Sequence, residues 1–314
     1  MSSESIKSGS RIAIVGVGQV GGAAAYSLIP ASIASELLLV DTRVDFRDGQ
    51  VQDLSDVAYS SKSRTRVRAG TYSDASQCDI VIITVGSRYT IGETSLGSLY
   101  RNVALLRNVI DAMTPFKSDA ILLVVSNPVD LLTSIALELS GLPPAQVIGS
   151  GTFLESARIR GLISDRTGVA PNSIDAYVLG VRGDSQVVAW SSATIGGVPI
   201  DKSLPTKGPL DRKALADECR DQPQKTIRAK GSTPFGIGYV VSNICSSILL
   251  DKRNVRLIGH FQPEFRCCFS LPAVIGRKGA LATIQIPLDD EEKAEVALSA
   301  NELRRTLESV HEDL

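Results

Sequence analysis

The sequence predicts an α/β fold, in which a doubly wound parallel sheet with helices on both faces is followed by an α+β C-terminal domain. Two observations predict this fold. In the first half of the chain, short apolar runs alternate with helical stretches, as they do when parallel strands are joined by crossover helices. In the second half that alternation stops, and strands and helices follow in a less regular order.

The length of the chain agrees with this two-part organisation. A chain of 314 residues exceeds the size at which a single core usually keeps growing, and it suits two domains of about 150 residues each. From the change in pattern we place the domain boundary between the predicted domains 1–148 and 149–314.

Four short apolar runs in the first half predict buried parallel strands, because strands covered on both faces are apolar throughout. Between them, apolar residues at helical spacing predict the helices that cross over the sheet. The expected strands are 11–16, 36–41, 79–86 and 120–128, and the expected helices are 19–29, 46–60 and about 93–117.

The second half predicts a mixture of shorter strands and longer helices. Its last segment, from Asp289 onwards, is amphipathic, and the acidic start suits the positive end of a helix dipole. The polar residues 203–213 predict a surface loop. The other expected strands are about 174–180, 186–190, 256–261, 265–271 and 281–286, and the other expected helices are 151–166, 211–229 and 235–250.

Charge and composition exclude several classes of partner. With 33 basic and 34 acidic residues, the net charge of −1 is unlike that of a protein that binds nucleic acid or an anionic membrane. No apolar stretch reaches the ~20 residues of a membrane span, and the polar start of the chain is unlike a signal peptide. The five cysteines are scattered without CxxC spacing, which argues against a disulfide framework or a zinc site. We therefore expect a cytoplasmic protein without a metal, in which the cysteines are core thiols.

A glycine-rich loop, GVGQVG, begins at Gly16, between the first expected strand and the first expected helix. In that context the pattern predicts a dinucleotide-binding Rossmann domain. Gly16 allows the tight turn, Gly18 the approach of the backbone to a pyrophosphate, and Gly21 the close packing of helix on strand. The helix begins near Gln19 and Val20, whose N–H groups lie at the positive end of its dipole. The alternative is a strand–turn–helix with incidental glycines.

A carboxylate stands at the end of the second expected strand. Asp41 follows Gly21 by 20 residues, the spacing at which an acid hydrogen-bonds the ribose hydroxyls of a bound dinucleotide. Its charge repels a 2′-phosphate, so we expect the cofactor to be NAD rather than NADP. Arg43, two residues further on, weakens that preference slightly.

Four further segments carry long and specific motifs. They are NPVD (127–130), GSGTFLESARIR (149–160), VLGVRGDSQ (178–186) and KGSTPFGIG (230–238). In this order, and over almost the whole chain, the sequence resembles the lactate/malate dehydrogenase family. The resemblance implies an NAD-binding Rossmann domain followed by that family's α+β substrate domain. It also implies a small carboxylated substrate and assembly as a homodimer or a homotetramer.

The resemblance implies roles for individual residues. Arg158 matches the arginine that binds the substrate carboxylate, which a planar guanidinium can do with two parallel hydrogen bonds. Asn127 matches an asparagine near the substrate and the nicotinamide, and Thr233 matches a residue that lines the substrate pocket. Arg88 matches a loop arginine near the cofactor phosphates. Each has a structural alternative: an ion pair or a solvated charge for the two arginines, and a turn or helix cap before proline for Asn127 and Thr233.

The sequence departs from the family pattern at the position of the catalytic histidine. The family places that histidine before Gly-Asp-Ser, paired with an acid, and it exchanges a proton with the substrate oxygen. Here the position is Arg182, and the acid is Glu155, one methylene longer than the usual aspartate. Histidine exchanges a proton near neutral pH, whereas arginine stays charged, so Arg182 can bind an oxyanion or a second carboxylate but cannot be an ordinary general acid–base. Losing such a group costs roughly 10²–10⁴ in rate.

Neither of the two histidines in the chain is expected to replace the family's catalytic histidine. His260 lies in an expected strand and His311 in the last helix, and we expect a packing or surface role for each.

A second departure lies in the loop 86–96, GSRYTIGETSL. The family carries an arginine at the position of Ser95, where it polarises the substrate carbonyl, and loss of such a charge costs about 10²–10³ in rate. Tyr89 lies near the positions that select the substrate side chain, and a large ring there indicates an altered pocket, unless it is a surface aromatic. We therefore expect ordinary lactate or malate turnover to be severely impaired.

Three functions remain open from the sequence. The first is an NAD(H)-dependent oxidoreductase acting on a carboxylate-bearing substrate other than ordinary lactate or malate, with altered proton transfer at Arg182, Glu155 and Arg158. The second is non-redox chemistry on the same scaffold, such as cyclisation, elimination or tautomerisation, with NAD structural or absent. The third is a non-catalytic NAD-binding protein. The complete cofactor loop and Arg158 favour the first.

Overall fold

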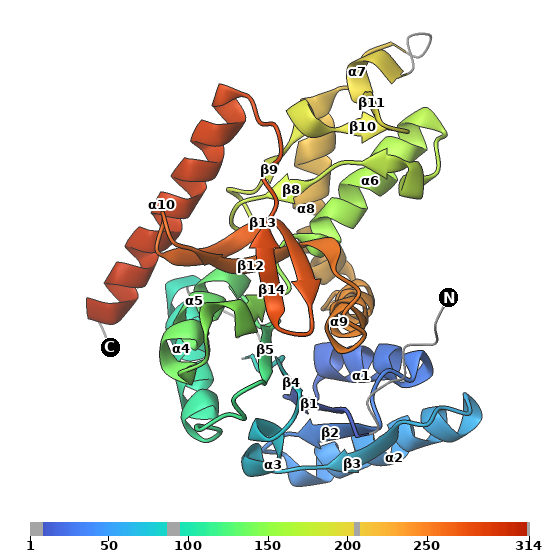
Figure 1. The fold of residues 1–314 in the computed structure, drawn as a ribbon, viewed down its shortest axis with the longest axis vertical. Coiled ribbons are helices and arrows are strands. Elements are labelled where there is room, and N and C mark those ends of the chain that lie inside the picture. Colours follow the sequence, from blue (N-terminus) through green and yellow to red (C-terminus); the bar gives the residue numbers. More distant parts are fainter. Residues whose placement is uncertain (1–8, 87–94, 204–207, 313–314) are drawn as a thin grey trace.

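The computed structural model describes residues 9–86, 95–203 and 208–312. Within them the chain has the predicted α/β fold, built around a nine-stranded sheet (Figure 1). The N-terminal strands and their helices form one end of the molecule, and the short strands of the second half form the other end (Figure 1).

The central sheet contains strands from both halves of the chain, in the order β14-β13-β12-β6-β5-β4-β1-β2-β3. Strands β1 to β6 pair in parallel. Strands β12 to β14 extend the sheet in antiparallel fashion, through the pairing of Gly259 with Gly149. The bounds are Arg11–Val15 (β1), Glu36–Val40 (β2), Arg66–Ala69 (β3), Ile80–Ile83 (β4), Ile121–Val124 (β5), Val147–Gly149 (β6), Asn254–Gln262 (β12), Cys267–Gly276 (β13) and Gly279–Thr283 (β14).

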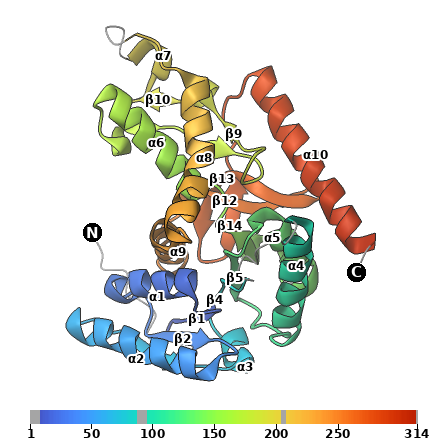
Figure 2. The same ribbon diagram turned by 180° about the vertical axis from the view of Figure 1, so that it is seen from behind.

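Alternation of side chains along the strands explains why helices cover both faces of the sheet. In β1, Ile12 and Ile14 face one side and Ala13 and Val15 the other, because successive side chains of a strand point in opposite directions. The isoleucines belong to a core formed with α1, α2 and α9, and the other pair to a core formed with α4 and α5 (Figure 2). The bounds are Gln19–Ala31 (α1), Val44–Ser60 (α2), Tyr72–Ser76 (α3), Ser95–Asp111 (α4), Val129–Ser140 (α5) and Pro234–Leu249 (α9).

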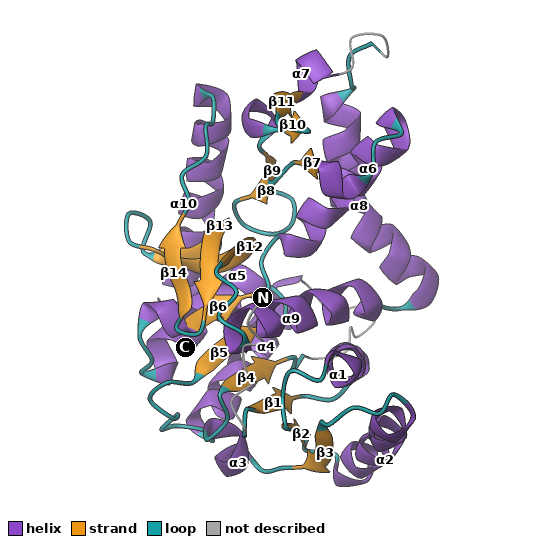
Figure 3. Ribbon diagram, turned by 45° about the vertical axis from the view of Figure 1, so that its right-hand side comes forward, coloured by secondary structure: helices purple, strands orange, loops and turns teal. Residues whose placement is uncertain are grey.

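The rest of the second half forms a smaller layer. Helix α6 packs against α8 around a separate cluster of buried side chains that includes Ile159, Ile163 and Cys219. Helix α10 packs against α5, β13 and β9 on the outside of the molecule (Figure 3). The bounds are Pro144–Gln146 (η1), Phe153–Thr167 (α6), Pro171–Ser173 (η2), Ile174–Asp175 (β7), Val178–Leu179 (β8), Val187–Val188 (β9), Trp190–Ser192 (η3), Thr194–Ile195 (β10), Val198–Pro199 (β11), Ile200–Ser203 (α7), Arg212–Lys230 (α8) and Asp290–Glu312 (α10).

The structure corrects several predicted elements. The helix expected at 93–117 ends at Asp111, ahead of Thr114, which precedes Pro115 and so disfavours helical backbone. The strand expected at 174–180 is two strands, because β7 pairs with β10 and β8 pairs with β9. The sequence patterns do not predict β3, α3, α5 or β6.

Other expectations concern composition and boundaries. All five cysteines are buried and none forms a disulfide, so their prediction as core thiols is confirmed. Among the helices of the described ranges, none combines the length and the apolar character that crossing a membrane requires. The predicted surface loop at 203–213 lies partly outside the described residues, and the domain boundary between residues 148 and 149 stays a prediction.

Candidate functional site

The glycine-rich loop connects β1 to α1 at the carboxyl edge of the sheet. Gly16 has a φ of 91°, a conformation that favours glycine, and a Cβ there would lie 2.9 Å from the backbone nitrogen of Val85. Gly18 is the N-cap residue of α1, where a Cβ would meet nothing within 4 Å. The first turn of α1 carries no acidic side chain, so its N–H groups and dipole favour an anion. The loop can therefore accept a phosphate close to its backbone.

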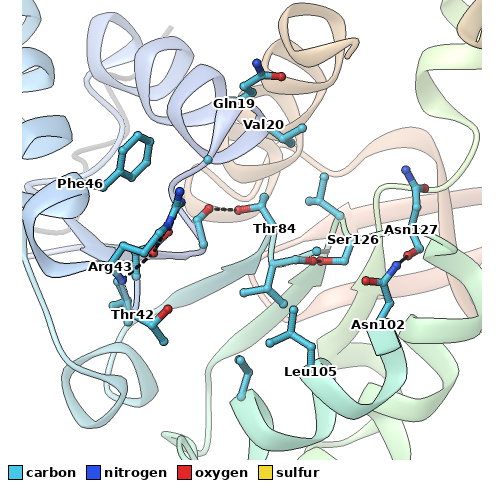
Figure 4. Close-up of a pocket in the computed structure, with 18 of the residues that line it drawn as sticks. Gln19, Val20, Thr42, Arg43, Phe46, Thr84, Asn102, Leu105, Ser126 and Asn127 are labelled. Atoms are coloured by element: carbon cyan, nitrogen blue, oxygen red, sulfur yellow. Dashed lines mark hydrogen bonds and ion pairs between the residues drawn. The ribbon is translucent and has the colours of Figure 1, made fainter. Parts of the chain in front are cut away.

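A cavity of 1110 Å³ opens beside this loop, where β1, β2, β4 and β5 end (Figure 4). Ligand sites commonly measure about 300–1,000 Å³, so this volume suits an extended ligand. Arg43 and Phe46 lie on one side of the cavity, and Asn102 and Asn127 lie on the opposite side (Figure 4). The predicted cofactor residues that line it are Gly16, Gly18, Gln19, Val20, Asp41 and Asn127.

Asp41 follows β2 and accepts four hydrogen bonds. Its Oδ1 accepts from the backbone N–H and Nε of Arg43 at 3.0 and 3.1 Å, and its Oδ2 accepts from the N–H of Val17 at 3.1 Å and from Nη2 of Arg43 at 3.2 Å. Burial raises the pKa of this carboxyl, but the hydrogen bonds and charge of Arg43 lower it by more, so the pKa lies below its ordinary value. Asp41 is thus an ionised group at the cavity wall.

A second group of polar residues meets the cavity at Asn127. Arg182 donates from Nε to Oε1 of Glu155 and from Nη1 to Oδ1 of Asn127, each at 2.9 Å. Arg158 lies one turn after Glu155 in α6, and its Nη1 is 3.5 Å from the same Oε1. The Glu155 side chain is 2% exposed, and those of Arg158 and Arg182 are 13% and 23% exposed. One buried carboxylate is therefore shared by two guanidinium groups.

Asp130 belongs to the same site, although the sequence patterns assign it no role. Its Oδ2 accepts a hydrogen bond from the backbone N–H of Arg182 at 2.7 Å, and this bond fixes the backbone at Arg182. Complete burial raises the pKa of Asp130 to about 7, although the hydrogen bond and the charge of Arg182 lower it. The charge of Glu155 raises it further. The indication in the sequence is the NPVD segment, which places Asp130 in the first turn of α5, after Asn127.

This raised pKa predicts that stability depends on pH. The folded-state pKa of about 7 exceeds the ordinary value of 3.8, so the folded chain binds the proton of Asp130 more tightly than the unfolded chain. The resulting stabilisation is fully present below pH ~4 and is lost as the pH rises through about 7, by at most about 4 kcal/mol. In Asp130→Asn the amide oxygen can still accept the N–H of Arg182, and we expect the contribution of Asp130 to the pH dependence of stability to disappear. Urea unfolding between pH 4 and 8 measures it.

Comparing the wild type with Asp130→Asn isolates the contribution of Asp130 to the pH dependence of stability. Burial lowers the pKa of His260, so that residue gives a slope of opposite sign as the pH falls. His260 is present in both proteins and cancels in the difference. If the difference between wild type and Asp130→Asn does not change with pH, Asp130 does not titrate as stated.

The structure supports no role for four other predicted site residues. Thr233 is the N-cap residue of α9, but its side chain makes no capping hydrogen bond, and it does not line the cavity as its neighbour Ser232 does. Arg88 and Tyr89 lie outside the described residues. Ser95 begins α4, and its side chain lies outside the described part of the structure. The roles of these four residues stay predictions.

The two histidines have structural roles, as predicted. His260 is buried in β12, where Nδ1 lies 3.0 Å from the carbonyl oxygen of Ile258 and Nε2 lies 2.8 Å from Oγ1 of Thr283. His311 pairs with Glu138 on the surface at 2.9 Å. We call Arg182, Glu155, Arg158 and Asn127 the Arg182 cluster; neither histidine belongs to it.

Sequence reasoning missed some residues that line the cavity. Phe46 stands three residues after Arg43 at the start of α2, and Tyr72 begins α3. Asn102 of α4 donates from Nδ2 to the carbonyl oxygen of Asn127 at 3.0 Å. Helical spacing from Arg43 could have indicated Phe46, whereas the positions of Tyr72 and Asn102 depend on how α3 and α4 pack.

The glycine-rich loop, Asp41 and the cavity together define a dinucleotide-binding protein.

Known proteins share this architecture over nearly the full chain. The family model of the lactate/malate dehydrogenase NAD-binding domain matches residues 10–149, and that of the family's alpha/beta C-terminal domain matches 152–314. L-lactate dehydrogenase A of Rhizopus oryzae is 41% identical over 295 residues, covering 94% of this chain and 91% of that protein. L-lactate dehydrogenase of Synechococcus sp. (strain JA-3-3Ab) is 38% identical over 301 residues, covering 95% and 98%. The crystal structure of minor L-lactate dehydrogenase from Enterococcus mundtii, in a ligand-bound form, has a TM-score of 0.92 at 31% identity, covering 97% and 99%.

The chain belongs to the lactate/malate dehydrogenase family. Its N-terminal part is that family's NAD-binding domain, and its cofactor is NAD. The described residues fit a bound NAD. The backbone at Gly18 is open and the start of α1 is free of acids, which suits the pyrophosphate. Asp41 lines the cavity next to Arg43, which lies on the side opposite Asn127 (Figure 4).

Gly21 packs behind the loop instead of lining the cavity, and this placement predicts a large effect of substitution. A Cβ at Gly21 would overlap the carbonyl oxygen of Gly16. We expect Gly21→Ala to displace the loop, lower the free energy of unfolding by about 1–3 kcal/mol and weaken NADH binding. Thermal unfolding and NADH titration measure the two effects. Gly49→Ala, in open space on α2, is the control and should preserve binding. Normal NADH affinity in Gly21→Ala would contradict the prediction.

Proposed function

We propose that this protein is an NAD(H)-dependent oxidoreductase acting on a small carboxylate-bearing substrate other than ordinary lactate or malate, with altered proton transfer. The hydrogen bond from Arg182 to Asn127 carries the proposal, because Asn127 lines the cofactor cavity while Arg182 is bonded to Glu155. This hydrogen bond holds the positive charge of Arg182 at the edge of the NAD site. When bound, NAD supplies or accepts a hydride.

Arg158 is the group that we assign to the substrate carboxylate. Its side chain is mostly buried in α6 next to α8, where Nη1 contacts Glu155 and donates to the carbonyl oxygen of Cys219 at 3.3 Å. These contacts hold one edge of the guanidinium, so the remaining N–H groups are oriented before a substrate arrives. A guanidinium held in this way suits two parallel hydrogen bonds to a carboxylate.

Arg182 is the group that we assign to the reacting oxygen. Negative charge develops on a carbonyl oxygen as a hydride reaches its carbon, and a fixed cation beside that oxygen stabilises the charge. Glu155 and Asn127 hold the guanidinium in place. Arginine does not give up its proton near neutral pH, so the hydroxyl proton comes from water or another group.

The charge of the cluster narrows the substrates to be tested. Two guanidinium groups share the single carboxylate of Glu155, so the three side chains carry an excess of one positive charge. Substrates with two anionic groups therefore belong in the panel beside those with one. Tyr89 and Ser95 are proposed to shape this pocket, Arg88 to lie near the cofactor phosphates and Thr233 to lie near the substrate.

Oxidation of NADH at high enzyme concentration tests the proposal. The panel contains 2-oxo acids, with one or two carboxylates, and cyclic imines. We expect turnover of at least one compound, and a fall of 100-fold or more in kcat/KM for Arg158→Ala. No turnover with any compound counts against an oxidoreductase. Product formed without net change in NADH indicates non-redox chemistry, and NADH binding without any product indicates a non-catalytic protein.

We also propose assembly as a homodimer or a homotetramer. Exposed aromatic side chains on the neighbouring helices α1 and α9 support an interface between copies. Tyr26, Phe235 and Tyr239 are 59%, 73% and 69% exposed. Light scattering gives the mass directly, and a monomer at micromolar concentration would contradict the proposal.

A further inference from the structure

The carboxylate expected to bind the ribose is already fully engaged within the chain. An ionised carboxylate offers about four acceptor positions. Asp41 receives four N–H groups, from the backbone of Val17, the backbone of Arg43, and Nε and Nη2 of Arg43. A ribose hydroxyl can therefore donate to Asp41 only if the guanidinium of Arg43 moves away.

The exposed group at this end of the cavity is the arginine. The Asp41 side chain is 8% exposed, whereas that of Arg43 is 49% exposed. Both residues line the cavity, and Figure 4 shows Arg43 near Thr42 and Phe46. A ligand that reaches this wall consequently meets a guanidinium before it meets a carboxylate.

Phe46 holds this guanidinium in place from the other side. The Cζ atom of Arg43 lies 4.2 Å from the centroid of the Phe46 ring, within the range of a cation–π contact. The contact with Asp41 uses Nε and Nη2, so the N–H groups of Nη1 lie on the far edge of the guanidinium. Two neighbours thus orient an arginine that keeps donors for a further acceptor.

The charge at this position differs from that expected for an isolated aspartate. An unpaired carboxylate repels a 2′-phosphate, and this repulsion is the usual reason why an acid here selects NAD. In the pair, the charge of Arg43 offsets that of Asp41, and a nearby arginine is the group that accommodates a 2′-phosphate. We propose that Arg43 sets the cofactor preference, and that this site binds dinucleotides with a 2′-phosphate, NADP(H), as well as NAD(H).

Affinities for NADH and NADPH, measured by nucleotide fluorescence at one ionic strength, test the proposal without any substrate. In the wild type we expect the Kd for NADPH to be less than 100 times that for NADH. Arg43→Ala releases Asp41 and removes the phosphate donor, so the ratio of the two Kd values should rise by tenfold or more. A charge-assisted hydrogen bond has about this effect, roughly 10- to 100-fold in affinity. A wild-type ratio of 100 or more, or a smaller change in Arg43→Ala, overturns the proposal.

Matched variants separate this contact from a general effect of charge. Arg47 lies one turn further along α2, pairs with Asp48 and does not line the cavity, so Arg47→Ala should leave the ratio unchanged. Asp41→Asn keeps the arginine and removes the negative charge, and should shift the ratio towards NADPH. An equal change in Arg47→Ala, or a shift towards NADH in Asp41→Asn, also overturns the proposal.

Adenosine nucleotides place the effect at the ribose. Adenosine 2′,5′-bisphosphate and 5′-AMP differ in the 2′-phosphate and lack the nicotinamide, so competition against NADH should show the same dependence on Arg43. If Arg43→Ala weakens both nucleotides equally, the arginine does not contact the 2′-phosphate and the proposal is wrong. Because these measurements involve no turnover, they stand apart from the outcome of the substrate panel.

Discussion

Glu155→Gln is expected to destabilise the fold and to disable the Arg182 cluster. The carboxylate of Glu155 is 2% exposed and lies 2.9 Å from Nε of Arg182 and 3.5 Å from Nη1 of Arg158. The amide retains one acceptor for Arg182 but removes the only negative charge that these two guanidinium groups share. Its NH₂ group falls where Oε2 is now, which is buried and has no partner among the described residues.

The size of the loss follows from this burial. Removing one partner of a buried ion pair costs about 3–5 kcal/mol. Because Arg182 and Arg158 retain 23% and 13% exposure, water screens part of the loss, and we expect about 3 kcal/mol. Displacement of Arg182 should lower kcat/KM for the best substrate of the panel by about 10²-fold, the usual effect of a misplaced catalytic group. Urea unfolding and steady-state kinetics measure the two changes.

Two variants show whether the effect belongs to the site. Glu155→Asp keeps the charge with a shorter side chain and should restore most of the stability. Glu36 also lies between two arginines, Arg11 and Arg68, but at the start of β2, away from the cavity. Glu36→Gln should therefore lower stability without changing kcat/KM. If Glu155→Gln and Glu36→Gln have the same effect on kcat/KM, the Arg182 cluster has only a structural role.

The strands that the sequence predicts well are those buried on both faces. In β4 and β5 every residue is buried, and each run is apolar throughout, so the residue types alone indicate a parallel strand. β3 is an edge strand with the pattern RVRA, in which only Val67 is buried, and it carries no such run. Burial is thus what makes a strand visible in the sequence.

The same burial conceals α5. Nine of its twelve residues are buried, because the helix packs between the sheet and α4. Four of the buried residues, Asp130, Thr133, Ser134 and Ser140, are polar, so polarity along this segment does not indicate which face of a helix is exposed. β6, with three residues, is too short to form a pattern. These elements are fixed by tertiary packing and not by local periodicity.

Only part of the candidate site can be predicted from the sequence. Spacing along the chain indicates Gly16 and Asp41, because the loop and the following strand form one local unit. No spacing indicates that Arg43 folds back onto Asp41, since that depends on side-chain geometry. Nor does it indicate the bond between Asp130 and the backbone of Arg182, which are 52 residues apart. The family resemblance identifies the position of Arg182, but only the structure shows which groups hold it.

Restoring two family residues, by Arg182→His together with Ser95→Arg, is expected to create lactate or malate dehydrogenase activity. Position 182 lies within hydrogen-bond reach of Glu155, so an imidazole there can pair with the carboxylate and exchange a proton near neutral pH. An arginine at position 95 supplies the charge that polarises the substrate carbonyl. The separate losses are roughly 10²–10⁴ and about 10²–10³ in rate.

Because both groups act in one transition state, their effects do not simply multiply. We expect the double variant to raise kcat/KM for pyruvate or oxaloacetate by about 10³-fold, and each single variant by much less. A pH–rate profile separates proton transfer from improved binding, because histidine should add a titration near pH 6–7 to any titration of Asp130, which every variant retains. Arg182→Gln with Ser95→Arg is the control, since it removes the same arginine without supplying a proton donor. If the control and the double variant reach the same rate, proton exchange by a histidine at position 182 is not what limits lactate or malate turnover.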